Sequence, residues 1–393
     1  MSVGAEESTP KSFCSVMDSS LISIDAFCQP TRGTMYECML VTGGAGFVGS
    51  TLAITLKQRF PDARVLVLDN LHRRGSELNL ARLGRAGVRF VHGDIRSPED
   101  LLALFPEAPG LLIECSAEPS AQAGYGESPE YLIRTNLLGC FHCLELARQA
   151  RSDCIFVSTS RVYPFEALNN LPFVEDATRF ALAPEQMVPG ASPAGISEAF
   201  PLAGARSLYG MTKLAAELMV EEYADAYGLR YIINRCGLLA GPWQMAKSDQ
   251  GVMALWMSAH YFHRGLSYIG FQGTGKQVRD VLHIDDFCDL LVDQLRHFSL
   301  YSGRRYNVGG GLVNSLSLRE TTQLCEEITG NKIVISSSTP TRPADVRIYI
   351  SDHRLISSVN GWWPRWDPRR TLTDIFHWLR AEEAQLRPLL VSQ

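Results

Sequence analysis

Short apolar runs recur along the first half of the chain, and longer amphipathic stretches separate them. We predict strands for the runs Cys38–Val41, Arg64–Leu68, Arg89–Val91 and Cys154–Val157. Helical patterns mark two long stretches, Tyr131–Ala150 and Leu208–Tyr227. Strands that alternate with helices are typical of a parallel sheet covered on both faces. The pattern therefore predicts an α/β fold with a doubly wound parallel sheet.

The chain has 393 residues, 46% of them hydrophobic, so it can bury a large core. We expect residues 35–236 to form a nucleotide-binding lobe and residues 237–393 to form mainly a smaller, C-terminal substrate-binding lobe, with 280–296 returning to the first. Residues 1–34 are rich in Ser, Pro, Glu and Thr and have no periodicity. They are expected to be a disordered extension, or to reflect the choice of start codon, and they lack the pattern of a secretion signal.

A glycine-rich turn follows the first predicted strand. Gly43, Gly46 and Gly49 recur at three-residue spacing, and Phe47 and Val48 lie between them at the start of a helical pattern. Such a turn brings backbone N–H groups and a helix N-terminus against a pyrophosphate. Glycine spacing also occurs in ordinary turns, so the prediction depends on the flanking strands. We assign these five residues to a dinucleotide site of the Rossmann type.

Acidic residues end the next two predicted strands. Asp69, followed by Asn70, comes about 20 residues after the last glycine, where a carboxylate can accept hydrogen bonds from the adenosine ribose. A negative charge there favours NAD over NADP, although Arg73 and Arg74 nearby reduce this preference. Downstream, the pair Asp94 and Ile95 is assigned to the adenine edge. The alternative for Asp94 is a turn carboxylate or a helix cap.

A Tyr and a Lys lie four residues apart in the helical stretch after residue 207. Tyr209 and Lys213 share one helix face, and an ammonium near a phenol lowers the phenol pKa from about 10. Tyr209 can then take the proton of a sugar hydroxyl as hydride leaves for NAD. Thr159, at the end of a predicted strand, is the hydroxyl expected to orient the substrate, with Ser158 as the competing candidate. A Tyr and a Lys at this spacing also occur by chance on helix surfaces.

These motifs resemble the extended short-chain dehydrogenase/reductase family of nucleotide-sugar epimerases and dehydratases. The resemblance rests on TGGAGFVGS, VSTSRVY and SLYGMTK, and it extends from Met35 to about Arg380. It implies tightly bound NAD, a nucleoside-diphosphate sugar as substrate, Asn136 as a further cofactor residue, and a homodimer built on a four-helix interface. In the second half, GKQVRDVLHIDD, YNVGGGLVNSLSL and RPADVRIYISD look like the CDP-paratose (CDP-tyvelose) 2-epimerase branch.

Two departures from the family refine the expected chemistry. Family dehydratases carry Asp and Glu directly after the Thr, and this chain has Ser160 and Arg161 there. The resemblance then implies an epimerase that inverts one carbinol centre of a hexose, C2 in this branch, with no net redox change. The family's His-x-Ala-Ala-Gln run is replaced by Glu114–Pro119, and a Gly usually found after Val-Tyr is replaced by Pro164.

Arginines supply candidates for binding a pyrophosphate, because guanidinium groups grip phosphate through paired hydrogen bonds. By resemblance, Arg279 and Arg342 clamp the diphosphate. Arg235 follows a strand and is also assigned to the substrate, with a salt bridge to Asp280 or another acid as the alternative. The remaining substrate assignments are Gln244, Gln250 and Asp345. By resemblance, the loop that holds Trp243 and the two glutamines faces the sugar or its nucleotide, and the alternative for Trp243 is packing alone.

Charge and cysteine usage exclude several classes of protein. The net charge of −5 and a pI of about 6.0 give no reason to expect nucleic acid or an anionic membrane as partner. The 10 cysteines are scattered, which indicates a reducing, cytoplasmic location. Cys140 and Cys143 form a C-x-x-C pair inside a helical stretch with no second pair, so we expect buried helix positions and no metal.

Three functions remain open at this stage. The leading one is the nucleotide-sugar epimerase that inverts C2. A 4-epimerase or a keto-sugar reductase of the same family is the second, and the reductase would exchange its cofactor during turnover. The third is a non-catalytic NAD sensor, in which Tyr209 and Lys213 would be dispensable.

Overall fold

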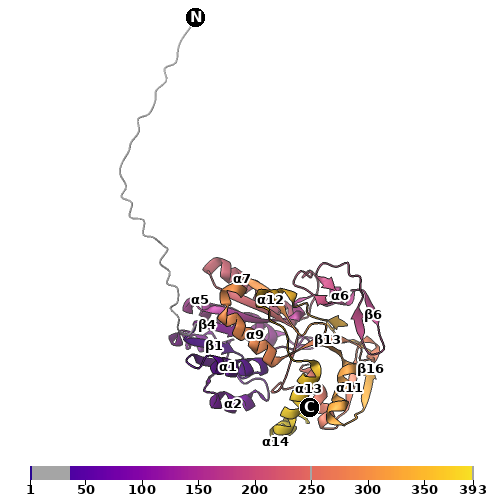
Figure 1. The fold of residues 1–393 in the computed structure, drawn as a ribbon. Coiled ribbons are helices and arrows are strands. Elements are labelled where there is room, and N and C mark those ends of the chain that lie inside the picture. Colours follow the sequence, from indigo (N-terminus) through magenta and orange to yellow (C-terminus); the bar gives the residue numbers. More distant parts are fainter. Residues whose placement is uncertain (2–35, 248–249, 392–393) are drawn as a thin grey trace.

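The computed structural model describes Met1 and residues 36–247 and 250–391. The predicted disordered extension falls on residues outside this part, apart from Met1, and stays a prediction. Two lobes are visible in the ribbon, with α1, α2 and α5 in one and α6, α11 and β16 in the other (Figure 1).

The first lobe is built on a seven-stranded parallel sheet, which confirms the predicted fold class. Its strands, in spatial order, are β14 (Arg304–Val308), β10 (Tyr231–Cys236), β5 (Asp153–Thr159), β4 (Leu111–Glu114), β1 (Cys38–Thr42), β2 (Arg64–Asp69) and β3 (Arg89–His92). The order reverses next to β1, between β1 and β4. In sheets of this topology, ligands bind in the crevice at the carboxyl ends of the strands beside such a reversal.

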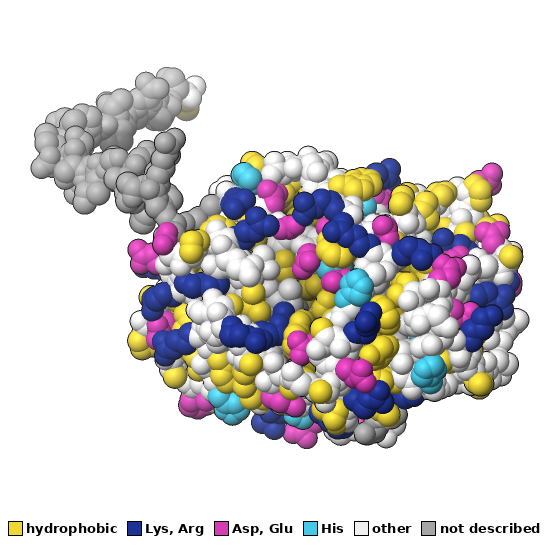
Figure 2. Space-filling model, turned by 60° about the horizontal axis from the view of Figure 1, so that its bottom comes forward, with side chains coloured by type: hydrophobic (Ala, Val, Ile, Leu, Met, Phe, Trp, Pro, Cys, Tyr) yellow, Lys and Arg dark blue, Asp and Glu magenta, His cyan; other side chains and the backbone are white. Residues whose placement is uncertain are grey.

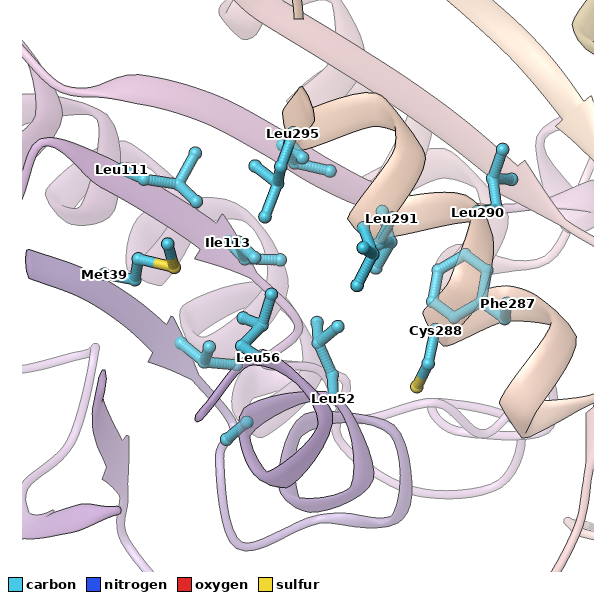
Figure 3. Packing of buried hydrophobic residues seen from close by; sticks show 14 of the residues in the cluster. Met39, Leu52, Leu56, Leu111, Ile113, Phe287, Cys288, Leu290, Leu291 and Leu295 are labelled. Atoms are coloured by element: carbon cyan, nitrogen blue, oxygen red, sulfur yellow. The ribbon is translucent and has the colours of Figure 1, made fainter. Parts of the chain in front are cut away.

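Helices cover both faces of this sheet. On one face lie α1 (Phe47–Arg59) and α9 (Ile284–Arg296), with α2 (Asn79–Arg85) beside them. Figure 3 shows Leu52 and Leu56 of α1 and Leu291 of α9 converging on the side chains of the sheet. On the other face lie α3 (Pro98–Leu102), α5 (Gly139–Ala150) and α7 (Leu208–Tyr227). Burial of alternate strand residues on opposite faces explains the near-continuous apolar runs in the sequence.

The second lobe combines a small sheet with a helical core. Its strands are β11 (Leu238–Ala240), β13 (Val278–His283), β15 (Ser315–Ser317) and β17 (Ile348–Tyr349), with the pairs β12 (Leu266–Ile269) and β16 (Ile335–Ser338), β6 (Phe173–Glu175) and β7 (Phe180–Leu182), and β8 (Ala191–Ser192) and β9 (Gly195–Ile196). Its core helices are α8 (Val252–Tyr261), α11 (Leu318–Thr329), α13 (Pro368–Ala381) and α14 (Glu383–Leu390).

The chain passes between the lobes more often than we predicted. The returning segment is longer than 280–296, because α9, α10 (Phe298–Tyr301), β14 and α12 (Arg354–Asn360) all pack with the nucleotide lobe. Conversely, the segment that begins with α6 (Phe165–Asn169) and ends with β9 lies inside the range 35–236 but packs against β13 and β17. A boundary at a single residue therefore does not describe this molecule.

The surface carries charges of both signs. On the face shown in Figure 2, basic and acidic side chains are interspersed, with apolar side chains between them. No helix in the described ranges has the length and apolar character needed to cross a bilayer.

Candidate active site

A cavity of about 990 Å³ runs along the carboxyl ends of the sheet and into the second lobe. Seventeen of the predicted site residues line it: Gly43, Gly46, Phe47, Val48, Gly49, Asp69, Asn70, Asp94, Ile95, Thr159, Tyr209, Lys213, Gln244, Gln250, Arg279, Arg342 and Asp345. Two predicted residues, Asn136 and Arg235, do not line it. The cavity thus unites residues that the sequence spreads over some 300 positions.

The glycine turn has the close backbone packing that a pyrophosphate cradle requires. Gly43 adopts a left-handed φ of 62°. A Cβ at Gly49 would lie 2.3 Å from the carbonyl oxygen of Gly43, so only glycine fits there. The turn leads directly into α1, whose first N–H groups face the cavity end of the sheet. These residues fit a dinucleotide.

Asp69 is held at the end of β2 by the turn itself. Its carboxylate accepts hydrogen bonds from the N–H of Ala45 at 3.0 Å and of Leu71 at 2.8 Å. Burial raises the pKa of Asp69, and these N–H groups oppose that rise. Of the two arginines nearby, Arg73 donates to the Met245 carbonyl at 2.6 Å, and Arg74 donates to the carbonyl of Pro388 at 3.2 Å.

Asp94 serves in a turn, as the alternative interpretation had it. Its carboxylate accepts hydrogen bonds from the N–H of Arg96 at 2.9 Å and from the amide of Asn70 at 2.9 Å, and it pairs with the Arg96 guanidinium at 2.6 Å. Burial would raise the pKa of Asp94, but Arg96 and Asn70 hold it well below its usual range. Asp94 also lines the cavity, and its contact with adenine stays a prediction.

Asn136 lies behind the cavity wall. It sits in a π-helical turn, Arg134–Leu138, between α4 (Glu130–Ile133) and α5. Its amide donates to the carbonyl of Glu118 and to Thr212, and its oxygen accepts from the N–H of Glu118 at 2.8 Å. Asn136 therefore positions the loop after β4 and does not itself line the cavity.

Tyr209, Lys213 and Thr159 meet at the floor of the cavity. Ser207 caps α7 by accepting a hydrogen bond from the N–H of Gly210 at 3.1 Å, which fixes Tyr209 in the first turn. Burial raises the pKa of Tyr209, and the Lys213 ammonium and a hydrogen bond with Thr159 pull it downward. Ser158 is committed elsewhere, because its hydroxyl donates to Glu217 at 2.5 Å. Of the two hydroxyl candidates, Thr159 is the one beside the phenol.

Lys213 has a buried acidic partner that the sequence reasoning missed. Its ammonium lies 3.5 Å from Glu114 Oε2, and each side chain is only 3% exposed. The ammonium also stands over the ring of Phe156 at 4.0 Å. Burial lowers the pKa of Lys213, but Glu114, with Tyr209 and nearby thiols adding to it, opposes this effect and the net direction is upward. The parity of β4 could have revealed the pair, since Glu114 shares a face with Leu112, which packs on the α7 side.

A cluster of cationic side chains lines the cavity away from the glycine turn, where we expect the substrate to bind. Arg279 donates to Asp345 at 2.9 Å, and Arg161 donates to the carbonyl of Ala344 at 3.0 Å. Arg342 lines the same wall. Burial lowers the pKa of Arg279 to about 10, with Asp345 opposing, which leaves the guanidinium charged at neutral pH. This end of the cavity can bind an anionic group.

Arg235 is fully buried and does not reach the cavity. Its guanidinium pairs with Glu217 at 2.6 Å and donates to the hydroxyl of Tyr163 at 3.2 Å. The expected substrate contact is therefore not present, and the salt-bridge alternative is correct with Glu217 rather than Asp280 as the acid. Strand parity again decides the outcome, because Arg235 points to the helix side of the sheet like Ile233.

The loop residues assigned to the substrate are tied into the protein. Gln250 donates to Glu118 at 3.1 Å and accepts a hydrogen bond from Arg73. Gln244 donates to the carbonyl of Leu239 at 3.0 Å. Trp243 lies against Trp378, with ring centroids 5.8 Å apart, which supports the packing alternative. Both glutamines, and Trp243 as well, still line the cavity.

Cysteines contribute no metal site in the described part of the chain. Cys140 and Cys143 are buried on α5, and the eight described cysteines are all free thiols. Within the same residues, no group of three or more His, Cys, Asp or Glu side chains is placed to hold a metal ion.

Comparison with known proteins gives one family. The model of the NAD dependent epimerase/dehydratase family matches residues 39–309. CDP-paratose 2-epimerase from Salmonella typhi is 32% identical over 346 residues, which cover 86% of this chain and 98% of that protein. dTDP-glucose 4,6-dehydratase from Mycolicibacterium smegmatis is 27% identical over 89% of this chain and 96% of that protein.

Solved structures agree with this result. UDP-glucose 4-epimerase from Thermus thermophilus, crystallised as a complex with NAD, superposes with a TM-score of 0.71 at 26% identity, covering 87% of this chain and 99% of that one. UDP-glucose 4-epimerase from Thermotoga maritima, crystallised with UDP-glucose, gives 0.69 at 25% identity over 88% and 99%. The chain therefore belongs to the NAD-dependent epimerase/dehydratase family and is an enzyme that uses NAD.

Proposed function

We propose that this enzyme is a nucleotide-sugar epimerase that inverts C2 of a CDP-linked hexose. The observation that carries the proposal is the floor of the cavity, where Thr159, Tyr209 and Lys213 meet and where Ser160 and Arg161 come directly after Thr159. Neither of these last two residues can serve as the acid and base of an elimination. The choice of C2 and of CDP is supported by the similarity to CDP-paratose 2-epimerase from Salmonella typhi.

Each residue of this group has a distinct task. Tyr209 takes the proton from the carbinol hydroxyl and later returns it, acting as general base and then as general acid. Lys213 supplies the positive charge that favours the phenolate, and Thr159 holds the hydroxyl that reacts. NAD, bound by the glycine turn and Asp69, supplies reversible hydride acceptance. Inversion requires the keto sugar to rotate, so that its opposite face meets the cofactor before hydride and proton are returned.

The substrate end explains how the sugar can turn while the substrate stays bound. Arg279 and Arg342 stand where they can grip a diphosphate, and Asp345 fixes the direction of the Arg279 guanidinium. An anchored diphosphate leaves the hexose free to rotate about its glycosidic linkage. With a volume of about 990 Å³, the cavity can hold part of a dinucleotide and part of a nucleotide sugar at the same time.

Proton NMR of the purified protein with CDP-, GDP- and UDP-hexoses, without added cofactor, tests this function. A new anomeric signal with an H1–H2 coupling changed by inversion at C2 is expected with a CDP-hexose such as CDP-paratose. Inversion at C4 would support the second candidate, a 4-epimerase, which the similarity to two UDP-glucose 4-epimerases favours. Net reduction of a keto sugar with exchange of the cofactor would indicate a reductase. If no sugar gives a new signal but NAD is released on denaturation, the non-catalytic NAD sensor is favoured.

We also propose a homodimer formed through α5 and α7. Large apolar side chains are exposed along these helices and the turn before α5, namely Leu138, Phe141, Met211, Leu218 and Tyr227. A pair of helices from each protomer would bury them in a four-helix contact. Light scattering after gel filtration should give twice the chain mass, and Phe141→Glu should shift the protein toward the monomer.

The free thiols support a reducing, cytoplasmic location as a further proposal. Seven of the eight described cysteines are buried, and none is in a disulfide. Fractionation of the cells that make this protein should recover it with cytosolic markers, and recovery with an oxidising compartment would contradict the proposal.

A further inference from the structure

The buried pair of Glu114 and Lys213 lies directly behind the catalytic phenol. Glu114 ends β4, Lys213 lies one turn after Tyr209 on α7, and the pair is separated by 3.5 Å. Lys213 lines the cavity and Glu114 does not, so the carboxylate approaches the ammonium from inside the protein. The family pattern named in the sequence analysis has a His here, and this chain has Glu114 in its place.

The surroundings leave the two groups dependent on each other. Oε1 of Glu114 is buried and has no hydrogen-bond partner among the described residues. Burial raises the pKa of Glu114, and the Lys213 ammonium opposes this rise, with a smaller contribution from the backbone N–H of Ser116. The other titratable groups that face the pair come from β5, α5, β10, the loop after β4 and α7: Cys154, Cys140, Cys143, Cys236, Cys115 and Tyr209. Burial raises the pKa of each of these thiols, so they remain neutral.

We propose that Glu114 is a positioning residue for the epimerase reaction, which holds the Lys213 ammonium in place and charged and thereby sets the pH range in which Tyr209 works. The effect on the pH range of Tyr209 rests on the proposed function, whereas the effect on Lys213 does not. A lone ammonium in so buried a place would lose its proton easily. The carboxylate keeps the proton on Lys213, and its negative charge also acts on Tyr209.

The sign of the effect on activity follows from the charges. A negative charge near Lys213 raises its pKa, because the protonated form is cationic. The same charge raises the pKa of Tyr209, because the ionised form is anionic. Loss of the charge should therefore move both limbs of a bell-shaped pH–rate profile toward lower pH. At the effective dielectric of protein interiors, we expect a shift of about one pH unit.

The first test needs no substrate. The chain has six lysines, so ¹³Cε-lysine NMR can follow each of them through a pH titration, and Lys213→Met assigns the signal. In the wild-type protein the pKa of Lys213 should lie above its usual 10.5, and in Glu114→Gln it should fall by about one unit or more. An unchanged pKa of Lys213 in Glu114→Gln would overturn the proposal.

A matched control is available on the same helix. Glu217 forms an equally buried pair with Arg235 at 2.6 Å, one turn beyond Lys213, and neither residue lines the cavity. Glu217→Gln should lower stability as much as Glu114→Gln does, but it should leave the titration of Lys213 and both limbs of the pH profile in place. Should Glu114→Gln fail to fold, Glu114→His, which restores the residue type of the family pattern, removes the same charge above neutral pH.

The second test measures turnover against pH with the sugar that the NMR panel identifies. Both limbs should move together to lower pH in Glu114→Gln, whereas a fall in rate at all pH values with fixed limbs would show a merely structural role and would contradict the proposal. The two proposals fail separately. If no sugar is epimerised by the wild-type protein, the function is wrong and the lysine titration still decides the role of Glu114.

Discussion

The two ends of the cavity are built in different ways. At the cofactor end, one continuous stretch from β1 to α1 forms the cradle with its backbone, and the Gly49 position is sealed by a carbonyl oxygen 2.3 Å from where a Cβ would be. At the substrate end, the side chains of Arg161, Arg279 and Arg342 come from three separate segments. A site formed by backbone has a shape that single substitutions change little. A site formed by side chains can be altered one residue at a time.

The comparison also explains where specificity can change within such a fold. A change at the cofactor end meets backbone that cannot move, so it affects folding and cofactor binding together. A change at the substrate end alters charge and hydrogen bonding while the strands below it keep their places. The group proposed to be catalytic, which includes Tyr209 of α7, lies between these two ends.

The largest effect is expected between the two ends of the cavity. Tyr209→Phe removes the hydroxyl that transfers the proton and keeps the ring that fills the site, so turnover should fall by about 10³-fold. Bound NAD, measured after denaturation and gel filtration, should remain at the wild-type level. Full activity in this variant would refute the role of Tyr209. Loss of NAD would mean that the Tyr209 hydroxyl is needed to bind the cofactor.

Gly49→Ala should break the backbone cradle. The new methyl group would lie against the carbonyl of Gly43 and the Cα of Gly44, at 2.3 and 2.8 Å, so the turn must shift. We expect a loss of about 1–3 kcal/mol in the free energy of unfolding, by urea titration, together with loss of bound NAD. Gly84→Ala on α2, where no atom lies within 4 Å of the added Cβ, is the control. It should leave bound NAD unchanged and, as a Gly→Ala change within a helix, raise the free energy of unfolding by about 0.5–1 kcal/mol instead of lowering it. Retention of NAD in Gly49→Ala would show that the glycine turn can shift to accommodate the methyl group and still bind the cofactor.

Arg279→Gln should weaken the substrate end alone. Loss of a charged hydrogen bond to phosphate costs about 1.5–3 kcal/mol, so the KM for the nucleotide sugar should rise roughly 10- to 100-fold with NAD content unchanged. Arg305→Gln, which removes a half-buried arginine paired with Glu221 outside the cavity, controls for the change in net charge. An unchanged KM in Arg279→Gln would place the diphosphate elsewhere.

The smallest effect is expected from Asp69→Asn. The amide oxygen can still accept the N–H of Ala45 or Leu71, but the negative charge that disfavours a 2′-phosphate is gone. With cofactor stripped from the protein, the preference for NAD over NADP should fall by about tenfold, which corresponds to roughly 1.4 kcal/mol. Calorimetric titration with each cofactor measures it, and an unchanged ratio would assign the discrimination to another group.

Local patterns made much of this structure predictable. The bounds of α7 were predicted as observed, and β2 ends at Asp69 as expected, because capping residues, glycine turns and apolar runs act over a few residues. Contacts between distant segments could not be predicted in the same way. A salt bridge of Arg235 with Asp280 or another acid was an open alternative, but only the arrangement of β10 and α7 in space identifies Glu217 as its partner, and only that of β4 and α7 pairs Glu114 with Lys213.

The late position of β14 has a consequence for the synthesis of the protein. β14 pairs with β10 and closes one edge of the seven-stranded sheet, and α9 covers one face of that sheet. A ribosome that has translated as far as β10 has therefore released strands whose edge is unpaired and whose apolar face is covered only in part, by α1 and α2. About 70 more residues must emerge before both are covered. Truncated products that end between β10 and α9 expose a sheet edge, which makes them prone to aggregate or to be degraded.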